Sequence, residues 1–305
     1  MSLTISVIIP TYNAQNYLPK LFESLQNQTV TFELIIIDSS SSDLTVEIAK
    51  KYTKEVYVIP KNEFDHGGTR TKAVQIAHGD IIVFLTQDAL PYDEYTIQNI
   101  VKVFNNVNIG AAYGKQIAYS KTNSFGKHLR IFNYPNNSYV RSKNDILKYG
   151  IKTAFLSDSF AAYRKQILKE IGWFKNDLIL GEDTYAGAKI ILHNFSLAYV
   201  SEAKVYHSHS YTLYEEFKRY FDIGVFHKLE SWILKEYGKA EGEGIKYIKS
   251  EFKYLLKNKK YFLLPQFFIR NALKYLAYKL GQKYEIFPMW ILLKLSMHKS
   301  WWKRI

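Results

Sequence analysis

The chain has 305 residues, of which 47% are hydrophobic and 16% aromatic, so it is long and apolar enough for a substantial core and is not intrinsically disordered. It contains no cysteine, which excludes disulfides and thiolate metal sites and fits a reducing compartment. Its formal net charge of +13 is concentrated in residues 211–305, which hold 19 Lys and Arg against 9 Asp and Glu. No basic segment precedes the first apolar run and no apolar stretch reaches about 18 residues. We therefore expect neither a signal peptide nor a conventional transmembrane helix.

Short β-rich runs alternate with helical patterns through the first 110 residues. Strands are expected within 4–12, 32–43, 56–60 and 80–88, and helices at 17–28, 44–52 and 69–78. This alternation predicts an α/β fold with a mostly parallel central sheet flanked by helices. Ligands of such sheets bind beyond the carboxyl ends of the strands, so the polar residues that end these strands are expected to converge on one crevice. They are Thr11, Tyr12, Asn13, Asp38, Thr86, Gln87 and Asp88.

The remainder of the chain divides into two parts. Residues 111–210 mix strand and helix patterns, and a helix is expected to begin directly after Gly181. From residue 211 the pattern becomes helical and cationic, and this part holds every Trp except Trp173. We therefore expect a binding and catalytic α/β domain over 1–210 and a basic, aromatic-rich helical extension over 211–305.

Three carboxylates lie at strand ends or at a helix N-terminus, where each could bind a ligand or take part in catalysis. Asp38 ends an apolar strand, where it either caps the following turn or accepts a hydrogen bond from a pyrimidine base. Asp88 either opens the turn before Pro91 or binds a magnesium or manganese ion that bridges a diphosphate. Asp183 lies at a helix N-terminus, where the helix dipole alone favours a carboxylate, and where a general base would stay ionised.

Histidines and a basic turn add two further candidates. His207 and His209 are two residues apart, so they would share one face of a strand that continued through them, either as metal ligands or as a structural pair. The segment "HGGTR" at 66–70 is a glycine-rich basic turn that enters a helix, which suits an anionic group. It matches neither a Walker A motif nor a dinucleotide fingerprint.

Five motifs, taken in order, resemble the inverting family 2 glycosyltransferases of the GT-A fold. They are "VIIPTYN" (7–13), "IIIDSSSSD" (35–43), "FLTQDALP" (84–91), "GEDTYAG" (181–187) and "VYHSHSY" (205–211). The likeness covers about residues 4–210, and "FDHGGTRTKA" and "TQDALP" are most similar to the rhamnosyltransferase branch. That resemblance implies transfer of L-rhamnose from dTDP-β-L-rhamnose to a sugar hydroxyl of a lipid-linked saccharide acceptor, as in bacterial enzymes of rhamnose-rich cell-wall polysaccharides. The product would be an α-rhamnoside.

The resemblance also implies roles for individual residues. Asp183 is expected to be the catalytic base, and Asp88 and His207 are expected to bind Mn²⁺ or Mg²⁺, with His209 as the alternative to His207. Thr86 takes the place of the family's first acidic residue, which leaves room for a deoxyribose. The expected donor-binding residues are Pro10, Thr11, Tyr12, Asp38, His66, Gly67, Arg70, Thr86, Gln87 and Asp88. The expected acceptor-binding residues are Asp158, Glu182 and Trp173.

The cationic extension suits an anionic membrane surface. Its tryptophans and neighbouring cations are Trp290, Trp301, Trp302, Lys299, Lys303 and Arg304. Such residues match the interfacial aromatic belt and acidic headgroups, which predicts a cytoplasmic protein that is peripheral at the inner face of the bacterial cell membrane. The alternative is a helical cap that buries its tryptophans in a homodimer or domain interface.

Two other functions stay open at this point. The same fold could use a UDP-sugar as donor, or the chain could be a non-catalytic protein that binds polysaccharide or nucleic acid. Nucleic acid is not expected as a partner, because the extension lacks the turn-separated recognition-helix pattern of common DNA-binding proteins.

Overall fold

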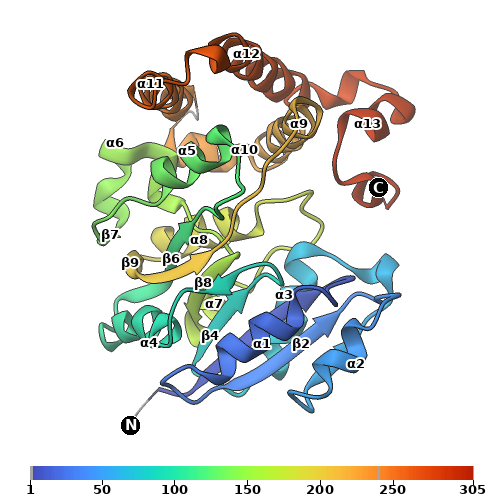
Figure 1. The fold of residues 1–305 in the computed structure, drawn as a ribbon, viewed down its shortest axis with the longest axis vertical. Helices are drawn as coiled ribbons and strands as arrows, with labels where there is room; N and C mark the ends of the chain where they lie inside the picture. Colours follow the sequence, from blue (N-terminus) through green and yellow to red (C-terminus); the bar gives the residue numbers. More distant parts are fainter. Residues whose placement is uncertain (1–2, 239–240, 305) are drawn as a thin grey trace.

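The computed structural model describes residues 3–238 and 241–304, which form one sheet with helices packed around it and further helices at one end (Figure 1). Four parallel strands make the first half of the sheet, in the order β3-β2-β1-β4. They are β1 (Ile5–Thr11), β2 (Glu33–Asp38), β3 (Val56–Val58) and β4 (Ile81–Leu85). All five residues of β4 are buried, as expected for a strand covered on both faces. The predicted strands of the first 110 residues are confirmed.

Beyond β4 the sheet is mixed. Strand β8 (Phe160–Arg164) runs antiparallel to both β4 and β6 (Ile109–Ile117), and β6 pairs in parallel with β9 (Ser196–Tyr206). The short strands β5 (Leu90–Pro91) and β7 (Tyr139–Arg141) pair antiparallel with β9. The carboxyl ends of β1, β4 and β9 therefore meet on one side of the sheet.

Helices connect and cover these strands. The α-helices before the extension are α1 (Leu18–Gln26), α2 (Thr45–Ala49), α3 (His66–Ile76), α4 (Thr96–Val101), α5 (Ser124–Asn133), α6 (Ile146–Tyr149), α7 (Lys165–Glu170) and α8 (Glu182–Leu192). The 3₁₀ turns of the described chain are η1 (Lys61–Glu63), η2 (Lys102–Asn105), η3 (Lys143–Asp145), η4 (Gly150–Ala154), η5 (Tyr261–Leu263) and η6 (Tyr284–Ile286). Helix α3 begins three residues before the expected start, because the Asp65 side chain caps it by accepting from the Gly68 amide at 2.7 Å.

The extension is helical, as predicted. It contains α9 (Leu213–Leu229), α10 (Ser231–Tyr237), α11 (Glu241–Lys257), α12 (Leu264–Gly281), α13 (Met289–Leu295) and α14 (Lys299–Trp302). A capping box between Thr212 and Glu215 starts α9. Phe221 and Val225 of α9 belong to the same apolar cluster as Ile8 and Phe84 of the sheet, so the extension shares the core. Among the described residues, no helix is long and apolar enough to cross a membrane.

The last residues of the chain pack against the loops that precede α3 and α8. Trp301 and Trp302 are only 5% and 1% exposed, and the Trp301 indole donates to the Asp177 carbonyl at 2.9 Å. Arg304 donates to the Phe64 carbonyl at 2.7 Å. The expectation that Trp301 and Trp302 face a membrane surface is therefore wrong, and the alternative of a buried cap describes them. Trp290 is 61% exposed.

Helices α9 and α12 cross at two glycines, which gives a test of the packing. A Cβ at Gly281 would lie 2.0 Å from the Phe221 carbonyl oxygen, and one at Gly224 would lie 2.2 Å from that of Tyr278. We expect Gly281→Ala to force the helices apart and lower the free energy of unfolding by about 1–3 kcal/mol, measured by urea denaturation.

Gly244→Ala is the matched control, because a Cβ at Gly244 in α11 meets nothing within 4 Å. Helix propensity alone should make that variant more stable by about 0.5–1 kcal/mol. Equal denaturation midpoints for Gly281→Ala and the wild type would contradict the close crossing.

Candidate active site

A cavity of about 910 Å³ opens at the carboxyl ends of β1 and β4 and is closed on the other side by the helical extension. Its volume is in the range of a nucleotide-sized ligand site. Thr11 ends β1, Asp88 follows β4, and Asp183 lies in the first turn of α8; all three line the cavity. The crevice expected from strand–helix alternation is therefore present.

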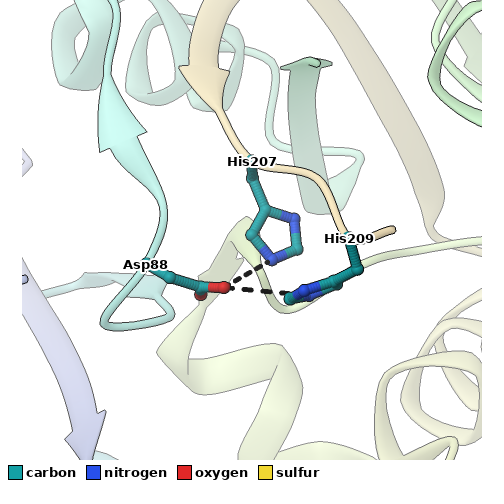
Figure 2. A group of neighbouring side chains, drawn as sticks. All are labelled: Asp88, His207 and His209. Atoms are coloured by element: carbon teal, nitrogen blue, oxygen red, sulfur yellow. Dashed lines mark ion pairs between the residues drawn. The ribbon is translucent and has the colours of Figure 1, made fainter. Parts of the chain in front are cut away.

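One end of the cavity holds a cluster of possible metal ligands, Asp88, His207 and His209 (Figure 2). Nε2 of His207 lies 3.4 Å and Nε2 of His209 lies 3.7 Å from Oδ2 of Asp88. Burial raises the pKa of Asp88, but the adjacent His207 outweighs it and holds that pKa well below its usual range. Burial and the neighbouring His207 lower the pKa of His209 to about 4. An ionised carboxylate beside a neutral imidazole suits a divalent cation, so these residues could hold one.

Gln116 orients His207, a role that the sequence analysis did not predict. Its amide nitrogen donates to Oγ of Ser157 at 3.0 Å, so its amide oxygen accepts from Nδ1 of His207 at 2.9 Å. This arrangement leaves the Nε2 lone pair of His207 directed at the cluster, as for a metal-binding imidazole. The sequence did contain a signal for this role. Gln116 stands within the largely apolar strand β6, and a buried glutamine there needs polar partners.

Asp183 lies in the first turn of α8, behind Gly181 whose φ of 84° requires glycine. One carboxylate oxygen accepts from the Thr184 amide at 2.6 Å and the other from the Asp158 amide at 3.3 Å. Burial, followed by the negative charge of Glu182, raises the pKa of Asp183 to about 6. The carboxylate is thus ionised near neutral pH and can still accept a proton, which suits a general base.

A buried ion-pair network lies beside Asp183. Nη1 of Arg70 is 2.9 Å from Oε1 of Glu182, and Nε of Arg70 is 3.0 Å from Oδ2 of Asp158. The hydroxyl of Tyr163 donates to the other Asp158 oxygen at 2.5 Å. Glu182 therefore offsets the charge of Arg70, while burial raises the pKa of Asp158 to about 8; all three side chains line the cavity. This geometry ties α3 to α8 and favours a positioning role over direct contact with a substrate phosphate.

The structure brings most of the predicted donor-binding residues to the cavity. Those that line it are Pro10, Thr11, Tyr12, His66, Arg70, Thr86, Gln87 and Asp88. Gln87 pairs with the backbone of Tyr12, accepting from its amide at 2.8 Å and donating to its carbonyl at 3.2 Å. The segments after β1 and β4 are thereby held together at the mouth of the cavity.

Four predicted residues are not brought to the cavity; the first, Asn13, instead accepts from the Ser42 amide at 2.9 Å. Asp38 is fully buried and accepts from the hydroxyl of Thr11 at 2.8 Å and from the amide of Ser41 at 2.7 Å, so it stabilises its own turn. Gly67 allows α3 to approach the loop before α8, since a Cβ there would lie 1.9 Å from the Lys175 carbonyl oxygen. Trp173 lines a second cavity of about 670 Å³ instead.

Two arginines of the cavity wall that lie near the metal-ligand cluster were not predicted. Arg130 of α5 donates to the His207 carbonyl at 2.8 Å, and Arg219 of α9 faces the same space. Both positive charges lower the pKa of His209, which reports their closeness to the metal-ligand cluster. Within residues 3–238 and 241–304, neither guanidinium forms an ion pair with a carboxylate. Unpaired arginines beside a cation site suit a diphosphate.

Comparison with known proteins gives sequence and structural relatives. Residues 6–172 match the profile described as "Glycosyl transferase family 2". The chain is 43% identical to the O-antigen chain rhamnosyltransferase WbaN of Salmonella anatum, over 98% of this chain and 96% of that protein. It is also 43% identical to the O-antigen chain rhamnosyltransferase RfbN of Salmonella typhimurium, over 99% of this chain and 97% of that protein.

Solved structures confirm the expected GT-A fold. The mannosyltransferase PcManGT of Pyrobaculum calidifontis, in complex with GDP-Man and Mn²⁺, superposes with a TM-score of 0.67 at 16% identity, covering 94% of this chain and 89% of that one. Residues 1–349 of TarS from S. aureus superpose with a TM-score of 0.54 at 18% identity, covering 93% and 91%. Because each superposition covers more than 90% of this chain, it includes most of the helical extension.

Proposed function

The chain belongs to glycosyl transferase family 2 and is a glycosyltransferase, and we propose that it transfers L-rhamnose from dTDP-β-L-rhamnose to a lipid-linked polysaccharide acceptor. Two relatives that match it over nearly their whole length are named O-antigen chain rhamnosyltransferases, which supports rhamnose as the sugar. The observation that carries the proposal is the joint placement of Asp183 and the Asp88 cluster on one cavity.

In the proposed reaction Asp183 acts as the general base. Its carboxylate takes the proton of an acceptor sugar hydroxyl as that oxygen forms a bond to the anomeric carbon of rhamnose. The bond from the anomeric carbon to the diphosphate breaks at the same time, and dTDP leaves with the electron pair. Attack opposite the leaving group inverts the anomeric centre, so a β-linked donor yields an α-rhamnoside. Arg70, Glu182 and Asp158 hold α8 in position for this step.

Charge on the leaving diphosphate is balanced at the other end of the cavity. Asp88, His207 and His209 would hold Mn²⁺ or Mg²⁺, which when bound acts as a Lewis acid on the diphosphate oxygens. Arg130 and Arg219 contribute further positive charge beside that cluster. Thr86, smaller than the acidic residue usual at this position, lines the cavity and leaves room for the deoxyribose of dTDP. The reaction takes place at the cytoplasmic face of the cell membrane, where a nucleotide donor and a lipid-linked acceptor meet.

Product analysis with purified protein tests this function. The protein is incubated with Mn²⁺, a synthetic lipid-linked saccharide, and either dTDP-L-rhamnose or a UDP-sugar, and products are read by mass spectrometry. We expect addition of one deoxyhexose from dTDP-L-rhamnose and no transfer from UDP-glucose or UDP-N-acetylglucosamine. Turnover of a UDP-sugar alone would favour the alternative donor. Saccharide binding without consumption of any donor would favour a binding protein.

The pKa of Asp183 predicts the pH dependence of transfer. The base must be unprotonated, and its pKa is raised to about 6, so the rate is expected to rise with pH up to about 6 and then level off. Below that pH the rate should fall about tenfold per unit, because the fraction of ionised Asp183 falls in that proportion. The turnover number with saturating donor is measured between pH 4.5 and 8. A rate that does not change between pH 5 and 7 would contradict the assignment.

A further inference from the structure

Helix α12 carries large apolar side chains on its solvent-exposed side and buries three polar side chains on its inner side. Its exposed apolar side chains, counted from the η5 turn that precedes it, are Tyr261, Phe262, Phe268, Ile269, Tyr275 and Leu276. We call these six residues the α12 stripe. They recur at a spacing of seven residues, which returns to the same side of a helix every two turns. Their side chains are between 49% and 74% exposed.

Three polar residues of α12 point inward, beside buried apolar residues such as Phe267 and Ala277. Arg270, Asn271 and Lys274 are each less than 10% exposed. Nη1 of Arg270 lies 2.6 Å from Oε2 of Glu216 in α9, and Nζ of Lys274 lies 3.5 Å from Oε1 of the same residue. A helix on the surface of a water-soluble domain usually turns its large apolar side chains inward and its charged ones outward, so the placement of the stripe, Arg270 and Lys274 is unusual. A contiguous exposed apolar patch of this kind marks a surface that binds another protein or a membrane.

Charge identifies what covers it. Residues 252–284, which contain the stripe, include eight Lys and Arg and no Asp or Glu. Two of these cations are the inward-facing Arg270 and Lys274, and the others are Lys253, Lys257, Lys259, Lys260, Lys279 and Lys283. If a second copy of the chain docked through the same stripe, the cationic segments of the two copies would face and repel each other. An anionic phospholipid surface complements it, because aromatic side chains enter the headgroup boundary while lysines meet the phosphates.

We propose that the α12 stripe is the membrane-docking surface of the protein and that its partner is a bilayer containing anionic phospholipid. Helices α11 and α12 lie at the end of the molecule opposite to α1 and α2, so a flat surface can reach the stripe (Figure 1). Arg270 and Lys274, on the inner face of the same helix, line the cavity. Docking through α12 would therefore place the cavity directly beside the bilayer, where a lipid-linked saccharide presents its sugar end.

Vesicle sedimentation tests the surface without any glycosyl transfer, so its outcome is separate from that of the proposed function. The probes are phosphatidylcholine vesicles with and without phosphatidylglycerol, at low salt, and the variant is Phe262→Ser combined with Phe268→Ser. Both side chains are mostly exposed, at 74% and 61%, so the fold should tolerate their replacement. The matched control is Leu147→Ser, because Leu147 is fully exposed but lies on α6 outside the stripe. Unfolding temperatures of all proteins confirm that they are folded.

We expect the wild type and Leu147→Ser to sediment with vesicles that contain phosphatidylglycerol, and the double variant to lose at least about 10-fold in vesicle affinity. Replacing Lys257, Lys259 and Lys260 by Gln should weaken binding to these vesicles and leave the weaker binding to pure phosphatidylcholine unchanged. Absence of wild-type binding would overturn the proposal, and so would equal binding by the double variant. A wild-type dimer in solution that dissociates in the double variant, without vesicle binding, would assign the stripe to a second copy instead.

Discussion

Replacing Asp183 by Asn is expected to abolish glycosyl transfer while leaving donor binding nearly intact. The carboxylate is the proposed acceptor of the proton from the attacking hydroxyl, and an amide cannot take that role. General base catalysis contributes about 10²–10⁴-fold to such reactions, so the turnover number should fall by that factor. Asn keeps the size of the side chain and can still accept from the Thr184 amide, which lies 2.6 Å from the carboxylate. The measurement is the turnover number together with the dissociation constant for dTDP by calorimetry.

The unfolding temperature of the same variant shows whether activity is lost because the base is missing or because the protein is less stable. Because burial and Glu182 raise the pKa of Asp183 to about 6, the ionised form is disfavoured in the folded protein at higher pH. The neutral Asn should therefore leave the unfolding temperature at pH 7.5 unchanged or raise it. Glu94→Gln is the control, because Glu94 is an exposed carboxylate outside the cavity and its replacement should change neither quantity. Turnover by Asp183→Asn close to that of the wild type would remove Asp183 from the role of base.

Removing the carboxylate of Asp88 is expected to eliminate metal-dependent donor binding. Asp88 supplies the negative charge of the cluster, and its Oδ2 lies 3.4 Å from Nε2 of His207 and 3.7 Å from Nε2 of His209. Loss of a group that merely orients a ligand costs 10–100-fold in metal affinity, so Asp88→Ala should cost at least about 100-fold. Calorimetry of dTDP binding with and without Mn²⁺ measures the difference, and His207→Ala should behave similarly.

Two further variants sharpen this test. Gln116→Ala removes the partner of His207 Nδ1 without removing a ligand, so it should lower metal-dependent affinity less than Asp88→Ala does. His193→Ala replaces an exposed histidine far from the cavity wall and should have no effect. If dTDP binding to Asp88→Ala still responded to Mn²⁺ as in the wild type, the cluster would not be the metal site.

Local patterns in the sequence predict much of the fold, and tertiary pairing explains the rest. The strands β1, β2, β3 and β4 alternate with helices, and such alternation leads to parallel pairing. Strand β8 enters between β4 and β6 in the antiparallel direction, although it follows both in the chain. Residues 111–210 show no alternation that would indicate this placement. The inward placement of Arg270, Asn271 and Lys274 in α12 was equally hidden, because their partners, Glu216 of α9 and Glu251 of α11, come from other helices.

Parts of the candidate site were predictable for a similar reason. Strand ends converge, so Asp88 and Thr11 were expected on one crevice, and both line the cavity. Asp38 also ends a strand, but whether its carboxylate faces a ligand or its own turn depends on Ser41, whose amide it binds at 2.7 Å. Arg130 and Arg219 lie on helices far apart in the chain, and only folding brings them beside His209.

Anomalous diffraction from crystals grown with Mn²⁺ and dTDP-L-rhamnose would locate the cation and the sugar relative to the proposed base. We expect a manganese peak bounded by Asp88, His207 and His209, with the diphosphate towards Arg130 and Arg219. We also expect the face of the anomeric carbon opposite the diphosphate to be open to the carboxylate of Asp183. A manganese peak away from Asp88, or a rhamnose ring whose anomeric carbon cannot be approached from the side of Asp183, would contradict the proposed mechanism.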